Sequence, residues 1–250
     1  MPIGSPHPNG CARSDVPHVS ADGQGPAPST AAPWSSPDVV AGFVTAPPND
    51  VLLSFAAAEL RRRGGRLLDI GCGAARNAAP LARLGWQVLG IDLSLPMLLA
   101  AATRAETEPD SGRLRLVQAS MDRLPVPSRG ADFIVAHGIW NLADSGVTFR
   151  RAVAEAARVA TPGAPLFVFT FSRHTLEPEA HPVPGERFVF TQFSGRPQCF
   201  LTEEELTTEL QDGGFDPEPG LSIREYNRRQ PGALVQQTPV IYEGVFRRRL

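Results

Sequence analysis

The stretch R-L-L-D-I-G-C-G-A-A-R-N-A-A-P-L-A-R-L-G-W-Q-V-L-G-I-D, residues 66–92 of a 250-residue chain, decides the fold. It begins with a short apolar run, Leu67 to Ile70, which is typical of a strand buried on both faces of a parallel sheet. Gly71 and Gly73 follow, and glycines here permit a tight turn and a close approach of the backbone to a ligand. A strand that ends in such a turn is typical of a ligand-binding unit in an open α/β sheet.

The second half of the stretch completes a strand–helix–strand unit. Residues 74–84 are predicted to form a helix that ends at Gly85, since glycine is the preferred residue just past a helix end. Residues 88–91 form the second buried strand, and Asp92 stands at its tip. A carboxylate there, about 20 residues beyond the glycines, is placed to accept hydrogen bonds from a ribose diol.

Two kinds of nucleotide ligand use such a unit, and two residues discriminate between them. A dinucleotide fingerprint has a third glycine where this chain has Arg76. The acid before the glycines, Asp69, would repel a pyrophosphate but suits a ligand with an ammonium and a sulfonium. The segment resembles motif I of the class I S-adenosylmethionine-dependent methyltransferases. Within that class it is most similar to the small-molecule enzymes of the tellurite-resistance and thiopurine type, through the runs G-C-G-A-A-R-N and G-W-Q-V-L-G-I-D-L-S.

The resemblance implies the fold, the cofactor and the residues that bind it. The expected fold is a Rossmann-like, doubly wound α/β domain over residues 34–250, with a mostly parallel seven-stranded sheet and an antiparallel edge strand. The expected cofactor is S-adenosylmethionine. The residues expected to bind it are Asp69, Gly71, Cys72, Gly73, Arg76, Asn77, Asp92, Leu93, Ser120, Met121 and Asp122.

The tip of the third predicted strand, residues 114–118, leaves two assignments open. Ser120 stands where the family usually has an acid or amide that contacts adenine, and Asp122 follows two residues later, so either side chain is a candidate for the adenine amine. Met121 is placed either to pack on the adenine ring or to lie in the core.

Residues 1–33 are rich in Pro, Gly, Ser and Ala, and we expect them to be disordered because they have little apolar surface to bury. Two helices should follow, the first capped by Ser36 and the second by Asn49 or Asp50. In the family that the motif resembles, such helices cover the donor pocket as a partial lid.

Further elements follow the second strand in an alternating order, which predicts a parallel sheet. The helix after Asp92 is expected to turn Leu98, Leu99 and Ala102 toward the sheet. Residues 131–136 and 166–171 are predicted as the fourth and fifth strands, and residues 221–226 and 240–246 as a final hairpin at the sheet edge.

The fourth predicted strand delivers His137 and Trp140 to the edge of the sheet where ligands bind. Methyl transfer from a sulfonium is an in-line displacement, and a hydroxyl or protonated amine acceptor benefits from a general base. His137 is the best-placed candidate for that catalytic role; the alternative is a histidine that only shapes the pocket. Trp140 either forms a wall of the acceptor pocket or packs in the core.

Residues 173–200 interrupt the alternation of strands and helices with several prolines and glycines. This connection is long for a compact domain, and long connections are often functional. We therefore predict a cap over the acceptor pocket, in which Arg173, Phe188 and Phe190 contact the acceptor. The alternative is that the phenylalanines cover a sheet edge or mediate a dimer.

Composition excludes several other functions. The net charge is −2, and all 24 basic residues are arginine, which argues against nucleic-acid binding and excludes lysine chemistry. The three cysteines are widely spaced and no metal site is expected. No membrane span or signal peptide is expected, which favours a cytoplasmic protein. We further expect a monomer or homodimer that acts on a small-molecule acceptor.

Two other functions stay open. One is a nicotinamide-dependent oxidoreductase, which would bind a dinucleotide in place of S-adenosylmethionine. The other is a non-catalytic S-adenosylmethionine-binding protein, which the glycine turn alone also permits.

Overall fold

The computed structural model describes residues 33–62, 64–107, 111–228 and 238–250. All but the last residue of the extension expected to be disordered, residues 1–33, lies outside these ranges.

A single mixed sheet forms the centre of the fold, in the order β3-β2-β1-β4-β5-β10-β8, with β9 also paired to β10. The strands from β3 to β5 are parallel, and β10 is antiparallel to β5, β8 and β9. The strands are β1 (Arg66–Ile70), β2 (Gln87–Asp92), β3 (Leu114–Gln118), β4 (Phe133–His137), β5 (Pro165–Phe171), β8 (Phe215–Pro217), β9 (Arg224–Tyr226) and β10 (Ile241–Arg248). The predicted α/β class and mostly parallel sheet are confirmed.

The last strands correct two details of the prediction. The antiparallel strand β10 is not at the edge but one place inside it, and the sheet has eight strands because the outermost position is divided between β8 and β9. The chain between them contains Pro219 and Gly220, and proline cannot donate to the ladder. The predicted pairing of residues 221–226 with 240–246 is present as β9 and β10.

Six α-helices lie in the described residues: α1 (Pro37–Thr45), α2 (Asp50–Arg62), α3 (Ala78–Leu84), α4 (Leu95–Thr107), α5 (Gly146–Val159) and α6 (Glu203–Asp212). The first cap is as predicted, because Ser36 Oγ accepts from Val39 N. Helix α3 begins at Ala78 and not at residue 74, because Ala75 is left-handed, with φ of 57°. It ends at Gly85, whose φ of 119° suits glycine.

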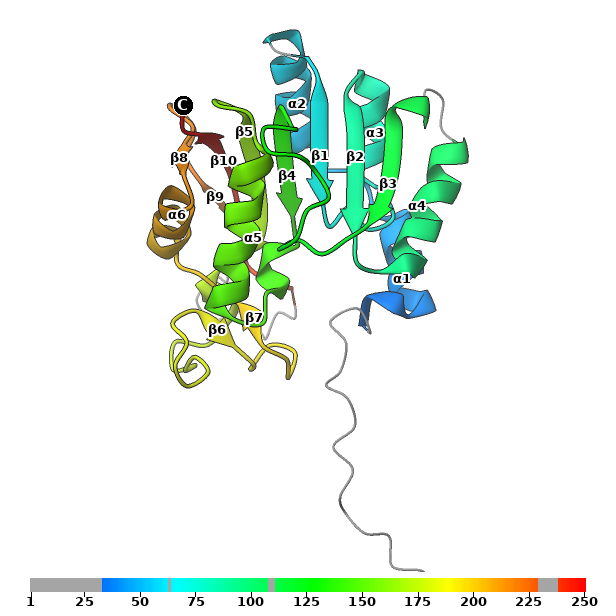
Figure 1. Ribbon diagram of the computed structural model, residues 1–250. Helices are drawn as coiled ribbons and strands as arrows, with labels where there is room; N and C mark the ends of the chain where they lie inside the picture. The colour runs from blue at the N-terminus through cyan, green and yellow to red at the C-terminus, as the bar shows by residue number, and fades with distance from the viewer. Residues whose placement is uncertain (1–32, 63, 108–110, 229–237) are drawn as a thin grey trace, which may run out of the picture.

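The helices cover the two faces of the sheet unequally. Helices α2, α3 and α4 contribute to one core with Trp86, Phe133 and Phe167. Helix α5 contributes to the core on the other face, and Figure 1 shows it in front of the half of the sheet that holds β4 and β5. Helix α1 has no buried residue and lies beyond the lower end of the strands in Figure 1.

Residues 173–200 form a separate small element, which we call the cap. It contains a 3₁₀ turn, η4 (Arg173–Thr175), and the two-stranded antiparallel sheet of β6 (Val189–Phe190) and β7 (Gln198–Cys199). In Figure 1 the cap lies beyond the carboxyl ends of the parallel strands, on the same side of the sheet edge as α1. In the described ranges no single helix is long and apolar enough to cross a membrane; only α1 with α2, as a pair bent by 58°, meets the length and composition criteria.

Candidate functional site

The glycine turn after β1 is held by hydrogen bonds to the end of β2. The amides of Gly71 and Cys72 both donate to Ile91 O at 2.8 Å, and the amide of Gly73 donates to Asp92 Oδ2 at 2.9 Å. At Gly71, with φ of 72°, an added Cβ would lie 2.7 Å from the side chain of Ile139. Glycine is therefore required there by protein packing as well as by backbone conformation.

Cys72 contributes its backbone to the turn, while its side chain is in the core. Its Sγ lies so near Gly90 that a Cβ on that residue would be 2.9 Å away. Burial raises the pKa of the Cys72 thiol well above its usual range, so the sulfur is neutral. Any contact of Cys72 with a cofactor would use its main chain.

Asp92 stands at the tip of β2, as predicted, and its carboxylate holds two backbone amides. In addition to the bond from Gly73, Oδ1 accepts from Ser94 N at 2.8 Å. Burial raises the pKa of Asp92, although these hydrogen bonds act in the opposite direction. The next residue, Leu93, is 43% exposed, so an apolar surface adjoins the carboxylate.

Asp69 is the most unusual group of the site. It is buried at the end of β1, and its Oδ1 has no hydrogen-bond partner in the described part of the chain. Burial raises the pKa of Asp69 to about 7, and the nearby charge of Arg76 opposes this rise. A buried carboxylate oxygen without a partner is costly, and such atoms are usually explained by a missing ligand or water.

Asn49 determines which nitrogen of His137 carries the proton. Its Oδ1 accepts from Leu52 N at 2.9 Å and its Nδ2 donates to Glu243 Oε2 at 2.7 Å, which fixes the orientation of the amide. The second N–H of the amide faces His137 Nε2 at 3.2 Å, so Nε2 must accept. The neutral imidazole therefore carries its proton on Nδ1.

Arg76 places a second donor beside that proton. Its Nη2 lies 3.3 Å from His137 Nδ1, and because both groups are donors they cannot hydrogen-bond to each other. Burial, with the charge of Arg76, lowers the pKa of His137 to about 3, so the ring is neutral. The ring also stacks on Phe169 at 4.1 Å between centroids. The result is a pair of N–H donors, Arg76 Nη2 and His137 Nδ1, that lie side by side.

The linker between α1 and α2 closes against the same turn. Pro47 O accepts from Arg76 Nη1 at 3.1 Å, and Asn77 Oδ1 accepts from Asn49 N at 2.9 Å. An added Cβ at Gly73 would lie 3.4 Å from the ring of Phe43 in α1. The N-terminal helices thus cover the glycine turn, as the lid prediction expects.

The tip of β3 lies beside the tip of β2. Ala119 N donates to Asp92 O at 3.1 Å, and Gln118 Nε2 donates to Leu93 O at 2.9 Å. At this tip Ser120 Oγ donates to Asp122 Oδ1, so these two side chains act as one polar group. Met121 packs in part against the core, which leaves part of its side chain exposed.

On the acceptor side, Trp140 and two residues of the cap are more buried than predicted. Trp140 is 1% exposed, packs against Phe149, and its Nε1 has no partner among the described residues. Phe188 is 1% exposed and Phe190 is 3% exposed. Phe188 packs in the core that α5 shares with the sheet, whereas Phe190 packs with Leu176 and Phe200 in a small core of the cap.

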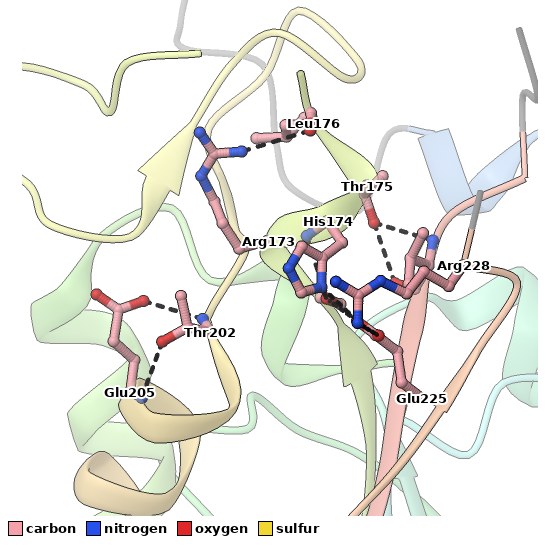
Figure 2. A network of polar contacts seen from close by, with 10 residues as sticks. Arg173, His174, Thr175, Leu176, Thr202, Glu205, Glu225 and Arg228 are labelled. Carbon is pink, nitrogen blue, oxygen red and sulfur yellow. Dashed lines mark hydrogen bonds and ion pairs between the residues drawn. The ribbon is translucent and has the colours of Figure 1, made fainter. Parts of the chain in front are cut away.

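Arg173 organises the cap from within. Its guanidinium donates to four carbonyl oxygens of the segment that follows and lies 4.8 Å from the ring centroid of Phe190. Figure 2 shows Arg173 directed to Leu176 and away from the neighbouring His174. These contacts give Arg173 a structural role, in place of the predicted contact with an acceptor.

Sequence reasoning missed the carboxylate of Glu243, which lies in β10 at 4% exposure. Glu243 accepts from Asn49 on one oxygen and from Tyr226 Oη at 2.8 Å on the other. A single acid within the apolar run of residues 240–246 was the available signal. In the described residues no group of three or more His, Cys, Asp or Glu side chains could hold a metal ion.

Known proteins resemble this chain in sequence and in fold. A family model described as a methyltransferase domain matches residues 68–168. A ubiquinone/menaquinone biosynthesis C-methyltransferase, UbiE, of Syntrophotalea carbinolica is 38% identical over 124 residues, which cover 48% of this chain and 50% of that protein. A ubiquinone biosynthesis O-methyltransferase of Azorhizobium caulinodans is 28% identical over 70% of this chain and 68% of that protein. The chain thus spans about half to two thirds of the length of these relatives.

Among solved structures, the 1,6-didemethyltoxoflavin-N1-methyltransferase of Burkholderia thailandensis, with bound 1,6-didemethyltoxoflavin and S-adenosylhomocysteine, has a TM-score of 0.58. It is 19% identical, and the match covers 92% of this chain and 93% of that one, so the likeness is one of fold. Sheet order, glycine turn and family match together define the class. Residues 68–168 belong to the methyltransferase domain family, and the fold of the chain is that of the class I S-adenosylmethionine-dependent methyltransferases. S-adenosylmethionine is the methyl donor of this family.

Proposed function

We propose that this protein transfers the methyl group of S-adenosylmethionine to a small-molecule acceptor. The observation that carries the proposal is a buried oxygen of Asp69 without a partner among the described residues, close to the adjacent N–H donors of Arg76 and His137. The amino-acid part of the donor has one ammonium and one carboxylate. The ammonium complements the carboxylate of Asp69, and the carboxylate complements the N–H donors of Arg76 and His137, in charge and in hydrogen-bonding capacity.

Each part of the donor then has its own residues. We assign the ammonium to Asp69, the carboxylate to Arg76 with His137 Nδ1–H, and the ribose to Asp92. The adenine lies on Leu93 and Met121, where the linked pair of Ser120 and Asp122 meets its amine. The residues that support this arrangement without direct side-chain contact are Gly71, Cys72, Gly73 and Asn77.

A bound donor supplies an activated methyl group on a sulfonium, and the chain's residues hold it in line with the acceptor. His137 is assigned to donor binding and not to proton transfer, since its Nε2 accepts from Asn49 and its pKa of about 3 makes it a weak base. The cap and the tip of β4 enclose the acceptor, whose small-molecule character the names of the relatives support. We further propose a cytoplasmic monomer or homodimer that acts without nucleic acid or membrane.

Calorimetric titration tests the proposal directly. The protein should bind S-adenosylmethionine and S-adenosylhomocysteine at micromolar concentration and should not bind NADH, and methyl release should follow with suitable acceptors. Asp92→Ala should weaken donor binding by about 100-fold, which corresponds to roughly 3 kcal/mol, because it removes charged acceptors for the ribose. Asp132→Ala, at the amino end of β4, is the matched control and should bind the donor normally. Unchanged affinity in the Asp92 variant would remove this residue from the site.

Arg76→Gln should discriminate between two related ligands. We expect affinity for S-adenosylmethionine to fall by about 10- to 100-fold, since a charged hydrogen bond to the donor carboxylate contributes about 1.5–3 kcal/mol. Affinity for decarboxylated S-adenosylmethionine should change by less than about threefold, because that ligand lacks the group. Arg151→Gln, in an exposed residue of α5, is the control. Equal loss for both ligands would show that Arg76 acts on the shape of the turn and not on the carboxylate.

A further inference from the structure

The side chain of Asn49, the residue before α2, connects the lid, the donor site and the last strand of the sheet. Its Oδ1 accepts from Leu52 N at 2.9 Å and so caps α2. Its two amide N–H groups donate to Glu243 Oε2 at 2.7 Å and to His137 Nε2 at 3.2 Å. A rotated amide would set a donor against Leu52 N and an acceptor against Glu243, so only one orientation satisfies all three neighbours.

Glu243 holds that amide from β10. It is 4% exposed, and its other carboxylate oxygen accepts from Tyr226 Oη at 2.8 Å. An ionised carboxylate has no proton to donate, so both of its neighbours must donate to it. Glu243 therefore determines the direction of these hydrogen bonds as well as the position of Asn49.

The direction of these bonds decides whether His137 and Arg76 can bind an anion. With Nε2 as an acceptor, the neutral ring carries its proton on Nδ1, which lies 3.3 Å from Arg76 Nη2. Both groups are then donors and remain available to a ligand. In the other tautomer, Nδ1 would accept from Arg76, which would occupy that N–H and set a lone pair against an incoming carboxylate.

The pair lies within the donor site. Arg76 follows Gly73 of the glycine turn by three residues and also donates to Pro47 O of the lid. Burial lowers the pKa of Arg76, and the nearby charge of Asp69 opposes this effect. The guanidinium is thus close to the carboxylate that we assign to the ammonium of the donor.

We propose that Asn49 and Glu243 are positioning residues for recognition of the donor carboxylate. They act without touching the donor, because they keep the proton of His137 on Nδ1 and so leave two N–H groups for the carboxylate. This inference rests on the proposed binding of S-adenosylmethionine and adds residues that select for a ligand with that carboxylate. Because Asn49 also caps α2, closure of the lid and recognition of the carboxylate are linked.

An exchange of acid and amide between the two positions tests the proposal at constant net charge. In the double variant Asn49→Asp/Glu243→Gln, position 49 still caps α2 and position 243 still accepts from Tyr226. The bond between the two positions is kept but reversed, and an acceptor now faces His137 Nε2. We expect ¹⁵N–¹H correlation spectroscopy of the donor-free protein at about pH 8 to show Nδ1–H in the wild type and Nε2–H in the double variant.

Calorimetry with two ligands gives the second readout. The double variant should lose about 10- to 100-fold in affinity for S-adenosylmethionine and less than about threefold for decarboxylated S-adenosylmethionine, which lacks the carboxylate. Glu243→Gln alone still offers Asn49 an acceptor, so the tautomer and both affinities should stay within about threefold of wild type. Asp50→Asn, in an exposed residue of the same helix end, is the matched control for the lid.

Asn49→Ser is a second variant, which retains a helix cap but removes both N–H groups. It should give a mixture of His137 tautomers and a smaller loss of affinity, about 3- to 10-fold, again only for the ligand with a carboxylate. Binding of S-adenosylmethionine by the wild type tests the proposed function by itself. An Nε2–H tautomer in a wild type that binds the donor would overturn only the positioning role. Equal losses for both ligands in the double variant, or the same loss in Glu243→Gln alone, would overturn it as well.

Discussion

Asp69→Asn is expected to stabilise the donor-free protein above pH 7 while weakening the binding of S-adenosylmethionine by about 100-fold or more. The carboxylate is buried, one oxygen has no partner, and burial raises its pKa to about 7. Burial of the asparagine amide avoids the free-energy cost of burying a charge. The amide cannot, however, form an ion pair with the ammonium of the donor. One substitution should therefore move stability and binding in opposite directions.

The effect of Asp69→Asn on the free energy of unfolding depends on pH, because the pKa of Asp69 differs between the folded and unfolded states. In the folded protein Asp69 holds its proton up to about pH 7, whereas in the unfolded chain it loses it near 3.8. Folding is therefore favoured by this group below pH 3.8, and that contribution is lost as the pH rises through 7. The stability gained by Asp69→Asn should be near zero at pH 4 and reach a few kcal/mol at pH 8.

Denaturant unfolding at several pH values measures the effect, and Asp132→Asn is the matched control. Burial opposes ionisation of Asp132, but hydrogen bonds from Arg66 hold the pKa of its carboxyl below its usual value. Its substitution should therefore destabilise the protein at neutral pH. If Asp69→Asn were also destabilising at pH 8, the carboxylate would have a partner in solution.

Phe188→Ala is expected to lower the free energy of unfolding by about 3–5 kcal/mol. The ring is 1% exposed and packs edge-on against Phe149 at 5.4 Å, with the guanidinium of Arg150 at 5.6 Å. Truncation would open a cavity where the cap meets α5. For a domain of this size the melting temperature should fall by roughly 10 °C, measured by calorimetry in the donor-free protein.

Phe193→Ala is the control from the same cap. Phe193 is 39% exposed and touches Phe171 and Phe200, so its loss should cost about 1 kcal/mol. Similar losses for the two variants would mean that the cap does not share the core of the sheet domain. The burial of Phe188 and Val189 also means that deletion of residues 176–197 would uncover core, so point substitutions are the better test of the cap.

The elements nearest the glycine turn could be predicted because local rules and buried-strand patterns agree there. The strand run at Leu67, the stop at Gly85 and the acid at Asp92 all lie where the sequence places them. The side of α4 that packs against the sheet was less predictable. Met97, Leu98 and Ala101 are buried, whereas Leu99, which was expected to face the sheet, is 60% exposed. An apolar stretch of that kind offers more than one helical face, and only packing against the sheet selects between them.

The polar network of the site depends on contacts between distant parts of the chain. Asn49 and Glu243 are 194 residues apart in sequence, and nothing local in either segment indicates the hydrogen bond between them. The same is true of His174 and Glu225. Arg173 was predicted to contact the acceptor as part of the cap, but its guanidinium donates to carbonyl groups of the following turn. Side-chain direction at such positions follows from tertiary structure.

Helix α1, which has no buried residue, has a kinetic consequence. Its contacts with the domain include Phe43 over Gly73 and a hydrogen bond from Arg104 to Val44 O, and the turn before it is held by Ser94 Oγ, which donates to Trp34 O at 3.0 Å. Segments with little buried surface open at a free energy far below that of global unfolding. Amide hydrogens of α1 should accordingly exchange with deuterium well before those of β1 and β4. Such opening would let the spent donor leave while the sheet stays intact, so the residence time of the product would be set by the lid.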